Sequence, residues 1–244
     1  MIAQTRAELL KLRTTRTMIG LMLGVFGGAV LYLLLTGLLI KPEGLAGKQE
    51  QRAFFTVEGF VELFSALSGV LLVTSEYRFG TIRPTFLFAP RRSKVIAAKL
   101  VASLIAGLTL GLVGEGLAFS LGYLALRGRG IPIALDGAEI AQLVVGALTG
   151  AAVWGALGVA FGAIVRNQVG AIIGVLTWGF LVENVVFAFV PSVGRFGPGS
   201  ATSAITGLTT DHLLAPSAGA VVLIAWAGSL ALAAVLLTAR RDVT

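Results

Sequence analysis

The chain has 244 residues, of which 56% are hydrophobic and only 13% are charged, and this excludes an ordinary soluble domain, whose charged share is about 25%. It contains no cysteine, which excludes disulfides, thiolate chemistry and cysteine-based metal sites. The net charge of +7 does not indicate a nucleic-acid partner, because the cations cluster at the ends of apolar runs, as membrane topology requires.

The first expected element is an interfacial helix over residues 1–16, a segment rich in Lys and Arg. The apolar run that follows is too long for the core of a signal peptide, and no small-residue cleavage site follows it closely. We therefore expect this helix to be retained. Its Leu9, Leu10 and Leu12 are expected to dip into the membrane interface while the cations reach the headgroups.

Residues 17–40 form the first predicted membrane span. They contain no charge and exceed the roughly 20 residues needed to cross the hydrocarbon core. Gly20, Gly24 and Gly28 recur every four residues, so they share a face that a neighbouring helix could approach closely. The alternative is that glycine is simply common in this chain, with 32 copies.

The second predicted span, residues 57–75, is the least hydrophobic, and the mixed charges of residues 41–56 before it are expected to lie in an outer loop. Four residues share one face of this span by their spacing: Glu58, Glu62, Ser65 and Gly69. A polar stripe is costly in lipid, so this face is expected to turn toward the bundle interior or a water-filled path. Glu62 is the interior candidate, whereas Glu58 is compatible with the outer interface.

Residues 76–94 interrupt the apolar sequence with cations, aromatic residues and prolines, and we call this segment the handle. Apolar runs flank it on both sides, so it is expected to be a loop at one membrane face, and its cations place that face in the cytoplasm. A short helix over residues 82–89 is predicted, capped by the Thr81 hydroxyl and ended by Pro90. Its apolar side chains predict cover by lipid headgroups or by a partner protein.

Four further spans are predicted, at residues 95–126, 140–165, 169–190 and 217–239. Residues 191–216, rich in Gly, Pro, Ser and Thr, are expected to form an extracellular polar segment. More than half of the 19 Lys and Arg residues fall in the segments that this arrangement places inside, namely the amino terminus, the handle, the turn at 166–168 and the carboxyl terminus. This asymmetry predicts an all-α polytopic protein of the cell membrane with both termini in the cytoplasm.

The stretch from Glu76 to Lys99, which contains the handle, resembles the segment between the second and third spans of ABC-2 type transporter permeases. The resemblance depends on these residues, in this order between two spans: Glu76, Arg78, Gly80-Thr81, Arg83, Pro90-Arg91-Arg92 and Lys99. The basic amino-terminal helix, the six spans and the polar break after the fifth span are also features of that family. The family comparison implies that the handle contains a coupling helix that seats in a groove of a cytoplasmic ATP-binding cassette ATPase.

The resemblance implies two sets of functional residues. The residues expected to couple the chain to the ATPase are Glu76, Arg78, Gly80, Thr81, Arg83, Phe86, Phe88, Arg91 and Arg92. The second and fifth spans lie along the substrate path in the family, which makes candidates of Glu62, Ser65, Glu183 and Asn184. For Glu115, in the third span, hydrogen bonding between helices is the preferred interpretation, and a polar lining of the path is the alternative.

Catalytic chemistry is scarce in this sequence. The Gly47-Lys48 pair lacks the six-residue frame and the following Ser or Thr of a phosphate-binding loop, so the chain is not expected to hydrolyse ATP itself. ATP and magnesium are expected in the partner ATPase. His212 is the only histidine, which gives a metal site or a Ser-His-Asp triad little to build on.

The predicted function is the permease subunit of an ATP-driven exporter for an amphipathic or lipid-like substrate. A second copy or a related permease subunit is expected to complete the pathway. The alternative is a non-transporting membrane anchor or assembly factor, whose basic handle recruits a cytoplasmic partner or anionic lipid. A secondary transporter is a weaker alternative, since the sequence has no inverted repeat.

Overall fold

The computed structural model describes residues 2–89 and 91–240, so Pro90, the predicted end of the short helix, lies outside it, as do the side chains of Glu58, Ala239 and Arg240. Every regular element in the described ranges is helical. The helices of the first half are α1 (Ile2–Thr14), α2 (Arg16–Leu39), η1 (Pro42–Leu45), α3 (Lys48–Phe55), α4 (Glu58–Arg78), α5 (Ile82–Phe88) and α6 (Arg92–Gly128). Those of the second half are α7 (Gly137–Val165), α8 (Gln168–Thr177), η2 (Trp178–Val182), α9 (Glu183–Phe189), α10 (Pro191–Gly194), α11 (Pro198–Ile205) and α12 (Pro216–Arg240).

Six helical stretches in the described part of the chain are long and apolar enough to cross a membrane. They are Arg16–Leu39, Lys48–Arg78, Arg92–Gly128, Gly137–Val165, Gln168–Phe189 and Pro216–Thr238. This is the pattern of an all-α, multi-pass membrane protein, as the uncharged runs predicted.

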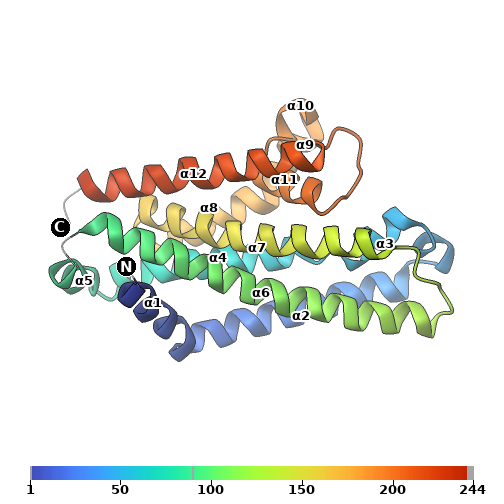
Figure 1. The fold of residues 1–244 in the computed structure, drawn as a ribbon, viewed down its shortest axis with the longest axis horizontal. Helices are drawn as coiled ribbons and strands as arrows, with labels where there is room; N and C mark the ends of the chain where they lie inside the picture. Colours follow the sequence, from blue (N-terminus) through green and yellow to red (C-terminus); the bar gives the residue numbers. More distant parts are fainter. Residues whose placement is uncertain (1, 90, 241–244) are drawn as a thin grey trace.

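Helix α7 forms the centre of the bundle, with α4 and α6 packed against it (Figure 1). Glycines allow the α4 and α7 backbones to come into contact: a Cβ on Gly158 would collide with the carbonyl oxygen of Ala66, and one on Gly69 with that of Gly155. Close approach through small residues is how helices gain packing energy in lipid, where the hydrophobic effect between them is weak. The spans Gln168–Phe189 and Pro216–Thr238 are peripheral, because only 11% of the apolar stretch of each is buried, and 28% of that of Arg16–Leu39 is buried.

The predicted glycine face of the first span is present in part. Gly24 and Gly28 on α2 face the rings of Phe64 and Phe60 on α4, which leave no room for a Cβ. Gly20 has open space where its Cβ would be. Two of the three glycines therefore contribute to helix packing.

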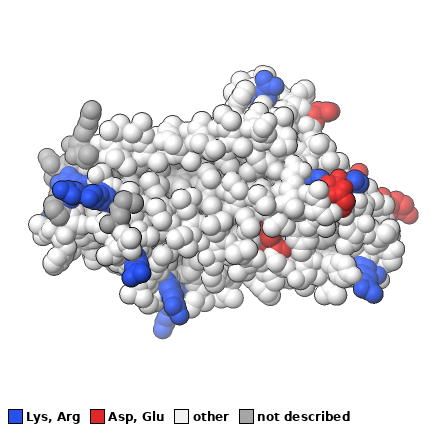
Figure 2. Space-filling model, viewed as in Figure 1, with Lys and Arg blue, Asp and Glu red and all other residues white. Residues whose placement is uncertain are grey.

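The two ends of the bundle differ in charge. Helices α1 and α5 and the last turns of α12 lie at one end, and α3, α9, α10 and α11 lie at the other (Figure 1). In the view of Figure 2, the first end shows cations without acidic residues, whereas the second end shows both signs. At the second end, Lys48 and Arg52 lie 3.0 and 3.6 Å from carboxylate oxygens of Glu139, so their charges are paired.

The expected outer loop at residues 41–56 is largely helical, and part of it is buried. Gln51 of α3 is fully buried, and its amide donates to the carbonyl oxygens of Leu45 at 3.1 Å and Pro132 at 2.8 Å. Arg52 donates to the carbonyl oxygen of Thr206 at 3.0 Å. Buried polar side chains need such partners, and here they fix α3 against the neighbouring loops. The other charged residues of this segment, Lys41, Glu43, Lys48 and Glu50, are exposed.

Residues 191–216, expected as a polar segment, contain the short helices α10 and α11. Helix α11 packs against α7 and α12, and its Ala201, Thr202 and Ala204 are buried. The segment thus turns back onto the bundle. Small residues make this possible: a Cβ on Gly146 of α7 would stand 2.8 Å from backbone atoms of Thr206.

Candidate functional site

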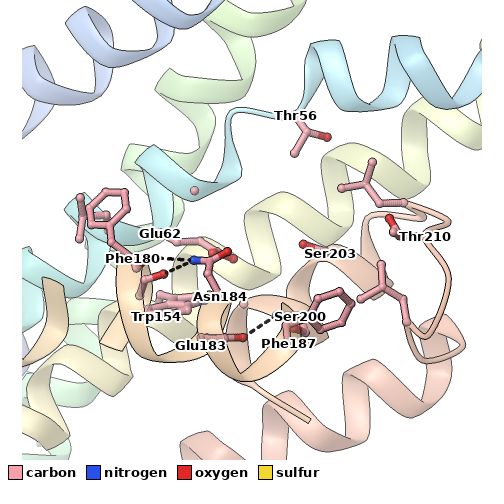
Figure 3. Close-up of a pocket in the computed structure, with 16 residues that line it drawn as sticks. Thr56, Glu62, Trp154, Phe180, Glu183, Asn184, Phe187, Ser200, Ser203 and Thr210 are labelled. Carbon is pink, nitrogen blue, oxygen red and sulfur yellow. Dashed lines mark hydrogen bonds between the residues drawn. The ribbon is translucent and has the colours of Figure 1, made fainter. Parts of the chain in front are cut away.

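A cavity of about 460 Å³ lies between α4 and the segment formed by α8, η2 and α9, toward the end of the bundle that carries α3 (Figure 3). Helices α7 and α11 supply further walls. The residues that line it are Thr56, Gly59, Glu62, Leu63, Trp154, Gly179, Phe180, Glu183, Asn184, Phe187, Gly199, Ser200, Ser203, Leu208, Thr210 and Leu213. Its volume is in the range of small-molecule sites.

A wide helical turn positions the wall contributed by the fifth span. The residues Trp178–Val182 form a π-helical turn between α8 and α9, and such turns free backbone carbonyls from the usual ladder. The Asn184 side-chain amide donates to two of these carbonyls, those of Gly179 at 2.9 Å and Phe180 at 3.3 Å (Figure 3). This fixes the Asn184 side chain and leaves its carbonyl oxygen, an acceptor, for the cavity.

The Glu183 carboxylate is seated against the start of α11. Its Oε1 accepts from the backbone N–H of Ser200 at 2.8 Å (Figure 3), where the unpaired amides of a helix N-terminus favour negative charge. Gly197 and Gly199 lie beside the same carboxylate, and a Cβ on Gly197 would collide with its Oε1. The side chain is 8% exposed. The glycines before and within α11 therefore make room for this carboxylate.

Glu62 approaches the cavity from α4 and is buried. A Cβ on Gly150 of α7 would stand 2.9 Å from its Oε1, so the absence of a side chain there admits the carboxylate. Beside it, the Trp154 indole of α7 lines the cavity, and its N–H donates a long hydrogen bond of 3.4 Å to the Thr202 hydroxyl of α11.

Three of the four predicted path residues, Glu62, Glu183 and Asn184, thus line one cavity. Ser65 does not line it, although it shares the predicted face of α4; its hydroxyl is buried and makes no hydrogen bond within the described ranges. Glu115 is also buried outside this cavity. Sequence reasoning missed Trp154 and Ser200. Trp154 lies in a uniformly apolar span, and Ser200 in a segment expected to be solvated.

The handle lies at the opposite end of the bundle, and most of its predicted coupling residues are on the surface. The exposed ones are Arg78, Gly80, Thr81, Arg83, Phe88 and Arg91. Helix α5 occurs where the sequence predicted it, but the Thr81 hydroxyl makes no capping bond. The reason is that Thr81 has helical φ and ψ of −82° and −4°, whereas a capping side chain requires an extended residue.

Phe86 differs from the expectation of an apolar group waiting for a partner. It is buried against Ile82 and Val95, and the Arg92 guanidinium lies 5.4 Å from its ring centroid. Phe88, in contrast, is 92% exposed, and Leu87 beside it is 82% exposed. Phe86 therefore holds α5 onto α6, and Leu87 and Phe88 are the apolar groups that the handle presents outward.

Glu76 also differs from the expectation of a handle residue, because it is buried inside α4. The Lys99 ammonium, fully buried on α6, donates to Glu76 at 2.8 Å and to Glu8 of α1 at 2.8 Å. Lys11 of α1 also donates to both carboxylates. Two cations and two carboxylates thus form a neutral buried cluster that joins α1, α4 and α6, and we call these four residues the ion cluster.

Lys11 is the member of the ion cluster that reaches solvent. Burial lowers the pKa of its ammonium, but the hydrogen bond that it donates to Glu76 and the charge of Glu8 outweigh burial, so the pKa lies above its ordinary value. Lys11 therefore remains charged at neutral pH. The sequence offered no signal for this pairing, since Glu8 and Lys99 are 91 residues apart.

No group of His, Cys, Asp and Glu side chains in the described part of the chain is arranged to hold a metal ion. Comparison with protein-family models gives no match. Comparison with curated proteins gives no significant match.

Proposed function

We propose that this protein is the permease subunit of an ATP-binding cassette exporter, which moves an amphipathic substrate out of the cytoplasm while a separate ATPase subunit supplies the energy. The observation that carries the proposal is the cavity that joins polar groups of the second span, Glu62, to those of the fifth, Glu183 and Asn184. Polar side chains are expensive at membrane depth and are retained where a substrate or water needs them.

The charge distribution supports an orientation for this function. The cations at the end that carries α1 and α5, where the view of Figure 2 shows no acidic residue, favour the cytoplasm for that end by the positive-inside rule. The cavity then lies in the outer half of the membrane. Phe180 and Asn184, which line the cavity, are exposed on the flank of the single chain, so a second copy on this flank would cover them and close the path.

The handle is the surface proposed to receive the ATPase. Leu87 and Phe88 project from a helix whose flanks carry Arg83 and Arg91, and large apolar groups ringed by charge are typical of a protein interface. The same pattern suits a membrane anchor, because exposed Leu and Phe also insert among headgroups while the cations bind anionic lipid. The anchor is therefore the second candidate.

Purification of the tagged protein from its native membrane separates the two candidates. We expect an ATPase to copurify and to lose its association in the double variant Leu87→Ala and Phe88→Ala, with the permease still folded in the membrane. The control is Arg91→Gln and Lys94→Gln, which removes two charges and leaves the apolar groups. If the charge variant alone has an effect, and it weakens binding to anionic vesicles, the anchor function replaces the transport function.

A further inference from the structure

The charged residues that line the cavity beside Glu62 and Glu183 are all acidic. Its polar lining consists of two carboxylates, one amide and several hydroxyls, and none of the described residues that line it is Lys, Arg or His. The side-chain amide nitrogen of Asn184 donates to the π-helical turn, so its carbonyl oxygen is the atom that remains as an acceptor for a ligand. The cavity therefore offers mainly hydrogen-bond acceptors and negative charge.

The chain itself holds the Glu183 carboxylate with dipoles and not with a cation. The Ser200 amide supplies one hydrogen bond, and no ion pair reaches Glu183 within residues 2–89 and 91–240. Amide dipoles orient a carboxylate without cancelling its charge. A positively charged ligand would be attracted to this group more strongly than in water, because the surroundings have a lower dielectric constant.

The remaining walls suit the rest of such a ligand. Trp154, Phe180 and Phe187 contribute aromatic surface to a cavity whose volume admits a drug-sized molecule. Aromatic faces attract cations in addition to burying apolar groups, and indole does so most strongly. An anionic lipid or a lipid-linked phosphate would meet two carboxylates here and no counter-charge, which is unfavourable.

We propose, resting on the transport role given above, that the substrate class is a lipophilic organic cation. Its charged group lies between Glu62 and Glu183, and its apolar body lies against Trp154 and Phe180. The two carboxylates select for charge, and the aromatic walls admit molecules of varied shape.

The matched ions tetraphenylphosphonium and tetraphenylborate test this assignment, because they have nearly the same shape and opposite charge. Binding to the purified full chain in nanodiscs of neutral lipid is measured by equilibrium dialysis, with empty nanodiscs as the partition blank. We expect saturable binding of the phosphonium and none of the borate. Equal binding of the two ions, or preference for the borate, overturns the proposal irrespective of any variant.

Substitutions then locate the binding. We expect Glu62→Gln and Glu183→Gln each to weaken phosphonium binding at least about tenfold, as loss of a buried charge partner does. The amide oxygen of Gln at position 183 can still accept from the Ser200 N–H, so the contact of this side chain with the start of α11 is retained. Glu115→Gln is the control, since this buried carboxylate lies outside the cavity. Binding that all three variants leave unchanged overturns the site.

This measurement requires no ATPase, which keeps the two proposals distinguishable. Selective binding of the cation by a chain that recruits no ATPase would remove the exporter function and keep the cation site. Copurification of an ATPase with a chain that does not distinguish the two ions would remove the cation site and keep the exporter function.

Discussion

Lys99 is a fully buried ammonium whose charge is balanced by two carboxylates from different helices, and it donates to the Leu72 carbonyl oxygen as well. A buried ion pair gives little net stability compared with an apolar replacement of the whole pair, because desolvation offsets the attraction. Removal of one partner is different, since it leaves a charge buried without compensation. The ion cluster should therefore be sensitive to single changes and tolerant of matched ones.

We predict that Lys99→Met lowers the free energy of unfolding by about 3 kcal/mol or more, because Glu8 and Glu76 are then both short of a counter-charge. Thermal unfolding of the purified protein in detergent measures the loss. The matched control is Lys94→Met, an exposed lysine on the same helix, which is expected to change little. The double variant Lys99→Met with Glu76→Gln should recover part of the loss; no recovery would contradict the pairing.

The two phenylalanines of α5 should behave differently. Phe86→Ala removes a ring buried against Ile82 and Val95 and is expected to destabilise the handle by about 3 kcal/mol. Phe88→Ala removes an exposed ring and should leave stability unchanged while it weakens ATPase association. Thermal unfolding and copurification give the two readouts. Equal loss of stability in both variants would contradict the described orientation of α5.

At the scale of elements, the α4–α7 contact depends on glycine. Gly158→Ala places a methyl group against the Ala66 carbonyl oxygen, a backbone atom that cannot move without the helix. We predict that this substitution lowers the free energy of unfolding by about 1 to 3 kcal/mol, which is typical of overpacking. Gly20→Ala is the control, since nothing lies within 4 Å of its Cβ position. Comparable destabilisation by the two substitutions would show that the contact is not specific.

The helices themselves could largely be predicted, whereas their contacts could not. Uncharged runs identified the spans, because a helix is forced to satisfy its own backbone in lipid. The cost of intramembrane polarity marked Glu62, Glu115 and Glu183 alike, and the family resemblance favoured Glu62 and Glu183, which the fold brings into one cavity. The orientation of Phe86 could not be inferred, because a helix of seven residues is too short to show a period. The pairing of Glu8 with Lys99 depends on tertiary packing and leaves no local pattern.

At the scale of the whole molecule, the orientation in the membrane is open to a direct test. The chain contains no cysteine, so single cysteines report their own position. We predict that Ser93→Cys, exposed in the handle, is shielded from a membrane-impermeant thiol reagent in intact cells. Thr209→Cys, exposed at the opposite end, should be labelled. Permeabilised cells, in which both should react, provide the control, and the reverse pattern in intact cells would invert the topology.

The ion cluster also constrains the order in which the chain is inserted during synthesis. Lys99 follows Glu76 by 23 residues and Glu8 by 91, so both carboxylates leave the ribosome well before their common counter-charge. Until the third span emerges, Lys11 is the cation that pairs with Glu8 and Glu76. Helix α1 then has no third span to pack against. A nascent chain arrested before Lys99 should therefore leave α1 open to protease, and a chain arrested after the third span has inserted should protect it.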